Sequence, residues 1–215
     1  MKKEMFLYCY KMTHDTGFAP NPYFGVLTLA TCKPIIRKCA KKGYWISGWA
    51  SNIVYGKDLV YNDKAQKLIY LAKVSEVLSF VEYWNNYPQK RQPDQSLERG
   101  KECFKSCGNT ITTKHKDISF CGDNIYEPDD NEFLGFKQHE NPHHGEGNKA
   151  HDLSGENVLV CEEFYYFGVK NALEITNKCF VIPRWKKISL EDKKASAVID
   201  YVTENYSKGL YPKKK

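Results

Sequence analysis

A stretch rich in glycine and proline limits what the first part of this chain can form: it reads HDTGFAPNPYFGVLTLATCKP, at 14–34. Gly17 and two nearby prolines prevent a continuous helix there and interrupt strand pairing, so we expect a loop. This loop carries Phe18 and Tyr23, aromatic side chains that flexible linkers lack. We therefore expect it to be ordered, either as part of a binding site or as packing against a core.

Segments with strand and helix character alternate along the chain. Runs of β-forming residues predict strands, Pro34 is typical of a first helical turn, and the period of the last long segment predicts a helix. The expected strands lie at 5–12, 44–51, 67–73 and 157–168, and the expected helices at 34–42, 74–84 and 188–206. The expected buried face of the last helix comprises Leu190, Ala197, Val198, Tyr201 and Val202. This order predicts an α+β fold with a small, mostly antiparallel sheet.

The length and the polar middle of the chain suggest its domain organisation. A chain of 215 residues is expected to form a single domain over 1–215. The segment 85–156 is polar and rich in glycine, proline and charge, so we interpret it as an insertion within that domain. A structureless loop of that length is unusual, and we expect a short ordered island at 117–128.

Charge and hydropathy limit the location and the partners. The net charge is +6, much of it from lysines near the two ends, which only weakly favours a nucleic-acid partner. No run approaches the roughly 18 apolar residues that a membrane span needs. The first residues, in which lysines surround and interrupt a short apolar patch, fit a signal peptide poorly. We expect a cytoplasmic protein with no membrane partner.

The eight cysteines include no CxxC pair. In a reducing compartment most of them are expected to be small buried hydrophobes. We expect no bound metal and no cofactor. The alternative is a zinc site; its ligands would come from Cys103, Cys107 and Cys121 with His115, His139, His143, His144 and His151.

Several segments together resemble a known family. They are DTGFAPNPYFGVLTLATCKPIIRKCAKKGYWISG, CGDNIY and VLVCEEFYYFG, between about Tyr8 and Gly168. They are similar to the family called nucleotide modification associated domain 2, whose members occur in phages and mobile elements beside genes for DNA base hypermodification. The resemblance implies a role in DNA or nucleotide modification, or in the response to it, but brings no established activity.

A second, local resemblance concerns the fold. AKKG is followed by YWISGWAS and then by LIYLAKVSEVLSFVEY. This order resembles the kernel of PUA-like barrels, which include the ASCH and EVE domains, although Tyr44 stands where an acid usually lies. The resemblance implies a small PUA-like β-barrel with flanking helices.

The 14–34 loop supplies residues for a nucleotide pocket. Asp15 and Asn21 offer the acceptors and the donor that reading a base edge requires. Phe18 and Tyr23 would stack on a base, which is worth about 1–3 kcal/mol per base. The structural alternative is that Asp15 caps a turn and that the aromatic side chains close one end of a barrel.

Two further pairs of residues extend this pocket. Lys33 and Arg37 would share one side of the helix at Pro34 and would contact phosphate, unless they lie on a solvated face. Asp123 and Asn124, in CGDNIY, would bind a ribose or a base edge, unless they form an Asx turn.

An enzymatic alternative rests on other residues. Some ASCH-type domains resemble small amidohydrolases acting on acylated cytidines with a lysine, a threonine and a glutamate; that resemblance implies Lys33, Thr31 and Glu76 as catalytic residues here. In the polar segment His143 or His151 would act as a general base. Asp152 is so near in sequence that we do not expect it to orient either histidine.

These observations lead to one leading function and two alternatives. The leading interpretation is binding of a nucleotide or of a modified base, free or in nucleic acid. One alternative is a hydrolase or transferase acting on a modified base or nucleotide. The other is a protein–protein adaptor whose partners belong to a modification system.

Overall fold

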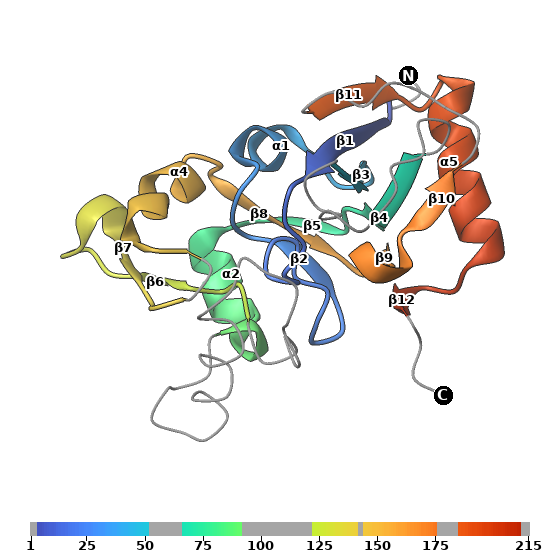
Figure 1. The fold of residues 1–215 in the computed structure, drawn as a ribbon. Helices are drawn as coiled ribbons and strands as arrows, with labels where there is room; N and C mark the ends of the chain where they lie inside the picture. The colour runs from blue at the N-terminus through green and yellow to red at the C-terminus, as the bar shows by residue number, and fades with distance from the viewer. Residues whose placement is uncertain (1–3, 52–65, 92–121, 142–143, 176–184, 212–215) are drawn as a thin grey trace. The chain divides into compact units, whose positions relative to one another are not determined.

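A computed structural model describes residues 4–51, 66–91, 122–141, 144–175 and 185–211. It has a mixed α+β fold in which strands predominate, as the sequence predicts (Figure 1). The chain divides into two compact units that alternate along the sequence. The first unit comprises Met1–Asp15, Lys41–Ser75 and Cys161–Lys215, and the second comprises Thr16–Ala40 and Glu76–Val160. A single domain with an insertion stays a prediction, since two such units can belong to one domain.

The first unit contains a seven-stranded sheet. Its order is β11 (Trp185–Ser189), β1 (Phe6–Met12), β3 (Trp45–Ala50), β4 (Gln66–Lys73), β9 (Glu163–Tyr166) and β12 (Gly209–Leu210), with β10 (Leu173–Ile175) also paired to β4. Only the β1–β3 and β9–β12 pairs are parallel. Among the described residues no pairing joins the outer strands β11 and β12, so the predicted PUA-like barrel is not confirmed.

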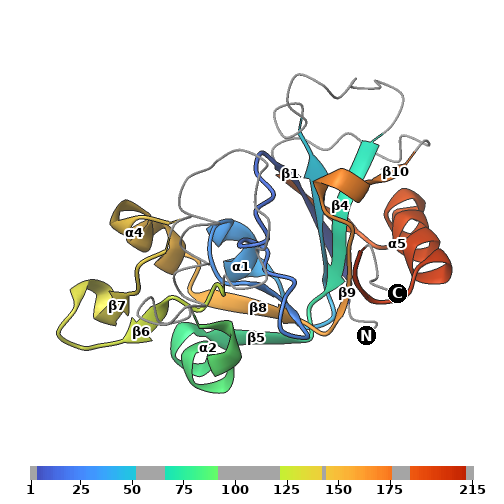
Figure 2. The same ribbon diagram turned by 60° about the horizontal axis from the view of Figure 1, so that its bottom comes forward.

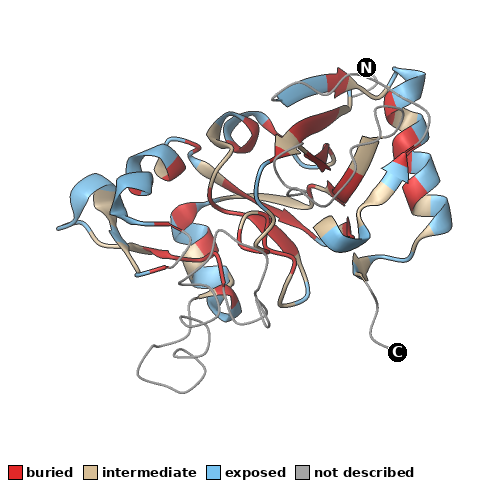
Figure 3. Ribbon diagram, viewed as in Figure 1, coloured by how far each residue is buried: buried red, intermediate tan, exposed pale blue. Residues whose placement is uncertain are grey.

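Helix α5 (Lys193–Asn205) packs its apolar side on this sheet (Figure 2). The Asp192 carboxylate accepts a hydrogen bond from the Lys194 amide at 2.8 Å, which caps the first turn. The predicted helix is confirmed, but Ile188 and Ser189 belong to β11 and the helix begins later. The predicted face is wrong in part, because Ala197 and Tyr201 are exposed. Figure 3 shows that α5 has both buried and exposed residues along its length. The buried residues are Ala195, Val198, Ile199 and Val202.

The second unit contains two smaller sheets. A three-stranded sheet has the order β2 (Leu27–Leu29), β8 (Asn157–Cys161) and β5 (Glu76–Ser79), and β6 (Tyr126–Pro128) pairs with β7 (Phe136–Gln138). The α-helices are α1 (Pro34–Cys39), α2 (Phe80–Asn86) and α4 (Lys149–Leu153). The 3-10 turns are η1 (Pro88–Lys90), η3 (Phe133–Gly135) and η4 (Glu146–Asn148), with η5 (Val169–Asn171) in the first unit. The described part of 85–156 is built into this unit.

Two segments differ from the sequence-based prediction. The strand expected at 157–168 is divided between β8 and β9, which belong to different sheets. The segment expected to be helical from residue 74 begins instead as strand β5, and only its second part forms α2. Ser79 ends the strand and starts the helix through a capping box with Glu82. Among the helices that the structure describes, none is long and apolar enough to cross a membrane.

Candidate active site

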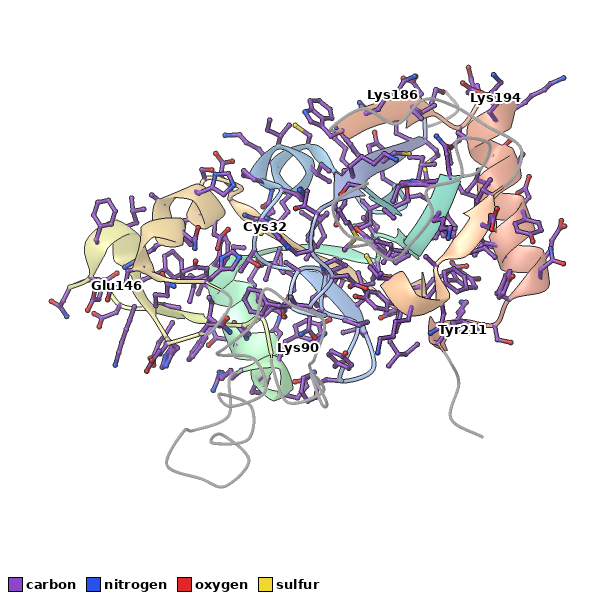
Figure 4. The ribbon with its side chains drawn as sticks, in the orientation of Figure 1. Cys32, Lys90, Glu146, Lys186, Lys194 and Tyr211 are labelled. Atoms are coloured by element: carbon purple, nitrogen blue, oxygen red, sulfur yellow. The ribbon has the colours of Figure 1, made fainter. Side chains whose placement is uncertain are left out.

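Cys32 lies in a sharp turn between β2 and α1, where the residue is partly exposed (Figure 4). Its φ is 57°, and that of the next residue, Lys33, is 44°. Residues other than glycine adopt this left-handed region rarely, at a cost of about 1–3 kcal/mol each, and such residues cluster at functional sites. A strained turn from a strand into a helix is also how hydrolases present a nucleophile. The backbone therefore marks Cys32 as a candidate nucleophile.

The imidazole of His144 connects Cys32 to a buried carboxylate. Its Nε2 lies 3.4 Å from Cys32 Sγ, and its Nδ1 lies 2.6 Å from Asp152 Oδ2. Asp152 is completely buried, His144 is 9% exposed, and Cys32 is the most exposed of the three. A nucleophile, a base and a group that orients the base, in this order, constitute a catalytic triad. We call these three residues the thiol relay.

The carboxylate of Asp152 is held from two further directions. Its Oδ1 accepts a hydrogen bond from the Cys32 backbone amide at 2.7 Å, and its Oδ2 accepts one from Tyr126 Oη at 2.8 Å. The turn η4 follows His144 and leads into helix α4, which carries Asp152 and returns its carboxylate to the histidine. The Phe18 ring packs 5.0 Å from the imidazole, centroid to centroid. These contacts restrict the orientation of the His144 and Asp152 side chains.

Arg37 links the two ends of the thiol relay through the backbone. This fully buried guanidinium donates from Nε to the Cys32 carbonyl at 2.7 Å, and from Nη2 to the Asp152 carbonyl. Its Nη1 donates to the Asn157 carbonyl at 2.7 Å. Burial lowers the pKa of Arg37 to about 10, opposed by the charge of Asp152, so the group is a cation at neutral pH. A Cβ on Gly155 would lie 2.4 Å from Arg37 Cζ, and glycine is needed there.

The protonation of the relay follows from its burial and its hydrogen bonds. Burial by itself lowers the pKa of His144, but the hydrogen bonds to Asp152 and Cys32 outweigh it and raise this pKa to about 9. Burial by itself raises the pKa of Asp152, but the hydrogen bond and the charge of His144 hold it below the ordinary value. The two groups therefore form an imidazolium–carboxylate pair at neutral pH, and the imidazolium faces the sulfur.

The same three residues present the donor types of a metal site, with ligand atoms within 4.8 Å of one another. However, the two nitrogens of His144 face different partners, Nε2 the sulfur of Cys32 and Nδ1 the carboxylate of Asp152. One ion cannot take the sulfur, the ring and the carboxylate together while the Nδ1 contact persists. Since catalytic zinc sites use three protein ligands, the arrangement favours a proton relay over a resident metal.

Of the other residues of the predicted zinc alternative, the structure describes two, and neither belongs to the thiol relay. His139 Nε2 lies 2.7 Å from Glu127 Oε2, and its ring stacks on Trp84. His151 is exposed on α4. Cys103, Cys107, Cys121, His115 and His143 lie outside the described residues.

Three of the residues predicted to contact a base, Phe18, Asn21 and Tyr23, lie in the second unit. Asn21 is completely buried; its amide donates to the Gly17 carbonyl, and its Oδ1 accepts from Lys90 Nζ at 2.9 Å. Phe18 is buried against His144, and Tyr23 is partly exposed. Their roles in base binding stay predictions. The internal contacts of the loop favour the alternative in which these side chains stabilise the fold.

The two further pairs predicted to extend the pocket are Asp123 with Asn124 and Lys33 with Arg37. The side chains of Asp123, Asn124 and Arg37 form hydrogen bonds within the protein. Asp123 is buried and accepts hydrogen bonds from Thr28 Oγ1 and Tyr83 Oη. The Asn124 amide donates to the carbonyls of Tyr83 and Tyr87. Arg37 binds three carbonyls, and Lys33 lies in the turn before α1, so a phosphate contact by this pair stays a prediction.

The remaining candidates are distributed over both units. Asp15 belongs to the first unit, where its carboxylate accepts hydrogen bonds from Tyr166 Oη and from the Val169 amide. Glu76 starts β5 and accepts a hydrogen bond from Tyr87 Oη at 3.5 Å. Thr31 is buried, and its hydroxyl has no hydrogen-bond partner among the described residues. Catalytic roles for Thr31, Lys33 and Glu76 stay predictions.

The Cys32–His144 pair is not among the catalytic residues that the sequence predicts. From the sequence, most cysteines are expected to be small buried hydrophobes, and His144 is a candidate only as a zinc ligand. A signal was present, since Cys32 stands between an apolar strand and the proline that starts a helix. The expectation that Asp152 would not orient a histidine concerned His143 and His151; with His144 it does so.

The fold and the thiol relay together describe an α+β protein in which a cysteine, a histidine and an aspartate lie in the order that cysteine-dependent enzymes use. The family described as nucleotide modification associated domain 2 matches the chain over residues 4–213. The chain belongs to this family, as its segments predicted, and a context of nucleotide or DNA modification follows. A comparison with curated proteins and one with solved structures each found no match.

Proposed function

We propose that this chain is a thiol-dependent enzyme that hydrolyses or transfers an acyl group on a nucleotide or a modified base. The observation that carries the proposal is the thiol relay, in which Nε2 of His144 lies 3.4 Å from Cys32 Sγ and Nδ1 lies 2.6 Å from Asp152. Membership in the family supports a nucleotide as the molecule that bears the acyl group. This corresponds to the enzymatic alternative of the sequence analysis, with a different set of catalytic residues.

Each residue of the relay has one task. The Cys32 sulfur, as thiolate, attacks the acyl carbonyl carbon; an S–C bond forms, and the bond from that carbon to the leaving nitrogen or oxygen breaks. The imidazolium of His144 gives its proton to the leaving group. Water, or an acceptor amine or hydroxyl, then attacks the thioester, loses a proton to His144 and releases Cys32. Asp152 keeps the imidazole oriented and stabilises its charged form.

The internal hydrogen bonds of the predicted binding residues weaken the interpretation of this chain as a nucleotide-binding module. Asn21, Asp123 and Asn124 satisfy hydrogen bonds inside the second unit. Groups that are already paired must lose those partners before they bind a base, which costs about 1–3 kcal/mol for each buried group left unpaired. Nucleotide binding without catalysis and a role as a protein–protein adaptor stay predictions. Neither function gives a role to the thiol relay.

Alkylation of cysteine tests the proposal on the purified full chain. Iodoacetamide is added at a low ratio, and peptide mapping by mass spectrometry follows Cys32 and Cys39 with time. Cys39 is the internal control, because it is exposed at the end of α1, the helix that follows Cys32. We expect Cys32 to react at least tenfold faster than Cys39, and His144→Gln to abolish this advantage. Equal rates in the natural chain, although Cys39 is the more exposed, would overturn the proposal.

Acylated nucleosides test the substrate class. An N-acylated cytidine and an N-acylated adenosine are incubated with the chain, and the intact mass is recorded with and without hydroxylamine, which cleaves thioesters. We expect an acyl adduct on Cys32, absent in Cys32→Ser and kept in Cys39→Ser. An adduct in Cys32→Ser equal to that of the natural chain would contradict the assignment of the nucleophile.

A further inference from the structure

We propose that Cys32 and His144 together also bind a thiophilic divalent cation, with Zn²⁺ as the best fit, and that this ion reversibly blocks the nucleophile. This inference rests on the proposed function in one respect: Zn²⁺ blocks the reaction only if the Cys32 sulfur is the nucleophile. Zn²⁺ takes thiolate at about 2.3 Å and imidazole at about 2.0–2.1 Å in tetrahedral geometry, which places these two ligand atoms about 3.5 Å apart. Cys32 Sγ and His144 Nε2 are separated by 3.4 Å. The distance between the two ligand atoms therefore matches that of two zinc ligands.

The surroundings of the imidazole match those of a metal-binding histidine. Such a histidine usually donates its other ring N–H to a carboxylate, which fixes the tautomer and the ring orientation. Here Nδ1 of His144 lies 2.6 Å from Asp152 Oδ2, and Asp152 is itself held by the Tyr126 hydroxyl. Asp152 thus acts on the ion through the ring, without leaving its own partners.

The incomplete ligand set makes the binding reversible. Two protein ligands leave two tetrahedral positions to water, whereas structural zinc sites use four protein ligands. Cys32 is partly exposed, and we expect the ion and its waters to approach it from solvent. When the ion binds, the sulfur is a thiolate and Nε2 is unprotonated; the displaced protons pass to solvent. The lone pairs of Cys32 Sγ and His144 Nε2 then coordinate the ion and are no longer available for nucleophilic attack or proton transfer.

Two measurements on the metal-free full chain test this site. In the first, Zn²⁺ is added before iodoacetamide, and the alkylation of each cysteine is mapped. We expect equimolar Zn²⁺ to slow the labelling of Cys32 at least tenfold and to leave Cys39 unchanged, and Mg²⁺ to protect neither. In the second, Co²⁺ replaces Zn²⁺, and a thiolate-to-cobalt charge-transfer band reports ligation by sulfur. The band should persist in Cys39→Ser and disappear in Cys32→Ser.

A variant of the carboxylate tests the role of Asp152 in the site. Asp152→Asn keeps the shape and one acceptor oxygen but removes the charge, and we expect Zn²⁺ affinity to fall about 10–100-fold. Circular dichroism of each variant confirms that it is folded. Zn²⁺ protection of Cys32 that is equal in Asp152→Asn and in the natural chain would overturn the indirect role of this carboxylate.

The outcomes separate this inference from the proposed function. If Cys32 reacts rapidly and Zn²⁺ does not protect it, the metal site is wrong while the thiol enzyme stands. If Zn²⁺ protects a Cys32 that is no more reactive than Cys39, the metal site stands and the enzyme proposal is overturned. The alkylation rate of Cys32 and its protection by Zn²⁺ are both measured on the natural chain, so neither result depends on the folding of a variant.

Discussion

The guanidinium of Arg37 donates from Nε to the carbonyl oxygen of Cys32 at 2.7 Å, so a buried cation holds the backbone of the proposed nucleophile. The same group donates to the carbonyl of Asp152. The two ends of the thiol relay, 120 residues apart in sequence, are thus tied to one side chain as well as to each other. A planar group with five donors in fixed directions suits this task better than an ammonium.

Arg37→Lys should therefore destabilise the fold and slow Cys32. A lysine cannot reach three carbonyls in different directions, and each buried acceptor left without a donor costs about 1–3 kcal/mol. We expect the free energy of unfolding in urea to fall by about 2–4 kcal/mol and the alkylation advantage of Cys32 over Cys39 to shrink. Lys38→Ala is the control, since its exposed ion pair with Glu156 is expected to be worth at most about 1 kcal/mol. Equal unfolding free energies for the two variants would contradict this prediction.

Gly155→Ala should act through the same arginine. The added Cβ would lie 2.4 Å from Arg37 Cζ, and three hydrogen bonds to backbone carbonyls hold this guanidinium in place. Overpacking of this kind costs about 1–3 kcal/mol. Gly147→Ala is matched to it, because nothing lies within 4 Å of a Cβ at Gly147. Thermal unfolding of both variants checks the prediction, which fails if they melt together.

Tyr126→Phe removes one hydroxyl and keeps the ring. The hydroxyl donates to Asp152 Oδ2 at 2.8 Å, and hydrogen bonds to charged groups contribute about 1.5–3 kcal/mol. We expect a loss of stability in this range, measured by urea unfolding, together with slower alkylation of Cys32. Unchanged stability and unchanged alkylation would contradict this prediction and show that Asp152 keeps its position without the Tyr126 hydroxyl.

The stability of the second unit should depend on pH through His144. Its pKa is about 9 in the folded chain and near the ordinary value of about 6.5 when unfolded. The folded state therefore binds the proton more tightly, and this contribution to stability is complete below about pH 6.5 and is lost as the pH rises through 9. Urea unfolding between pH 6 and pH 10, with a chelator present, should show this decrease in the natural chain. His144→Gln should lack that part of the decrease, and equal slopes for both chains would exclude the effect.

Asp15→Ala distinguishes a structural role from the predicted nucleotide contact. The change removes the acceptor for Tyr166 Oη and the Val169 amide, and we expect a loss of about 1–3 kcal/mol. The alkylation rate of Cys32 should stay the same, because these contacts lie in the other unit. Weaker nucleotide binding with unchanged stability would instead support the sequence-based role of Asp15.

Local patterns in the sequence determined several elements of this protein. The β-forming run FLYCYKM predicts β1, and Pro34 followed by an apolar stripe predicts α1. Both predictions depend on neighbouring residues only, because propensity and capping act within a turn or a few residues. Family membership also followed from the order of segments along the chain.

Only the tertiary structure decided which residues meet. The run 157–168 is one β-forming stretch in sequence, yet pairing with β5 on one side and β4 on the other divides it between two sheets. Likewise Cys32 and His144 are separated by 112 residues, and no local pattern specifies that contact. Side-chain chemistry was readable from the sequence, whereas the partner of each group depends on long-range packing, which fixes distances that propensity does not encode.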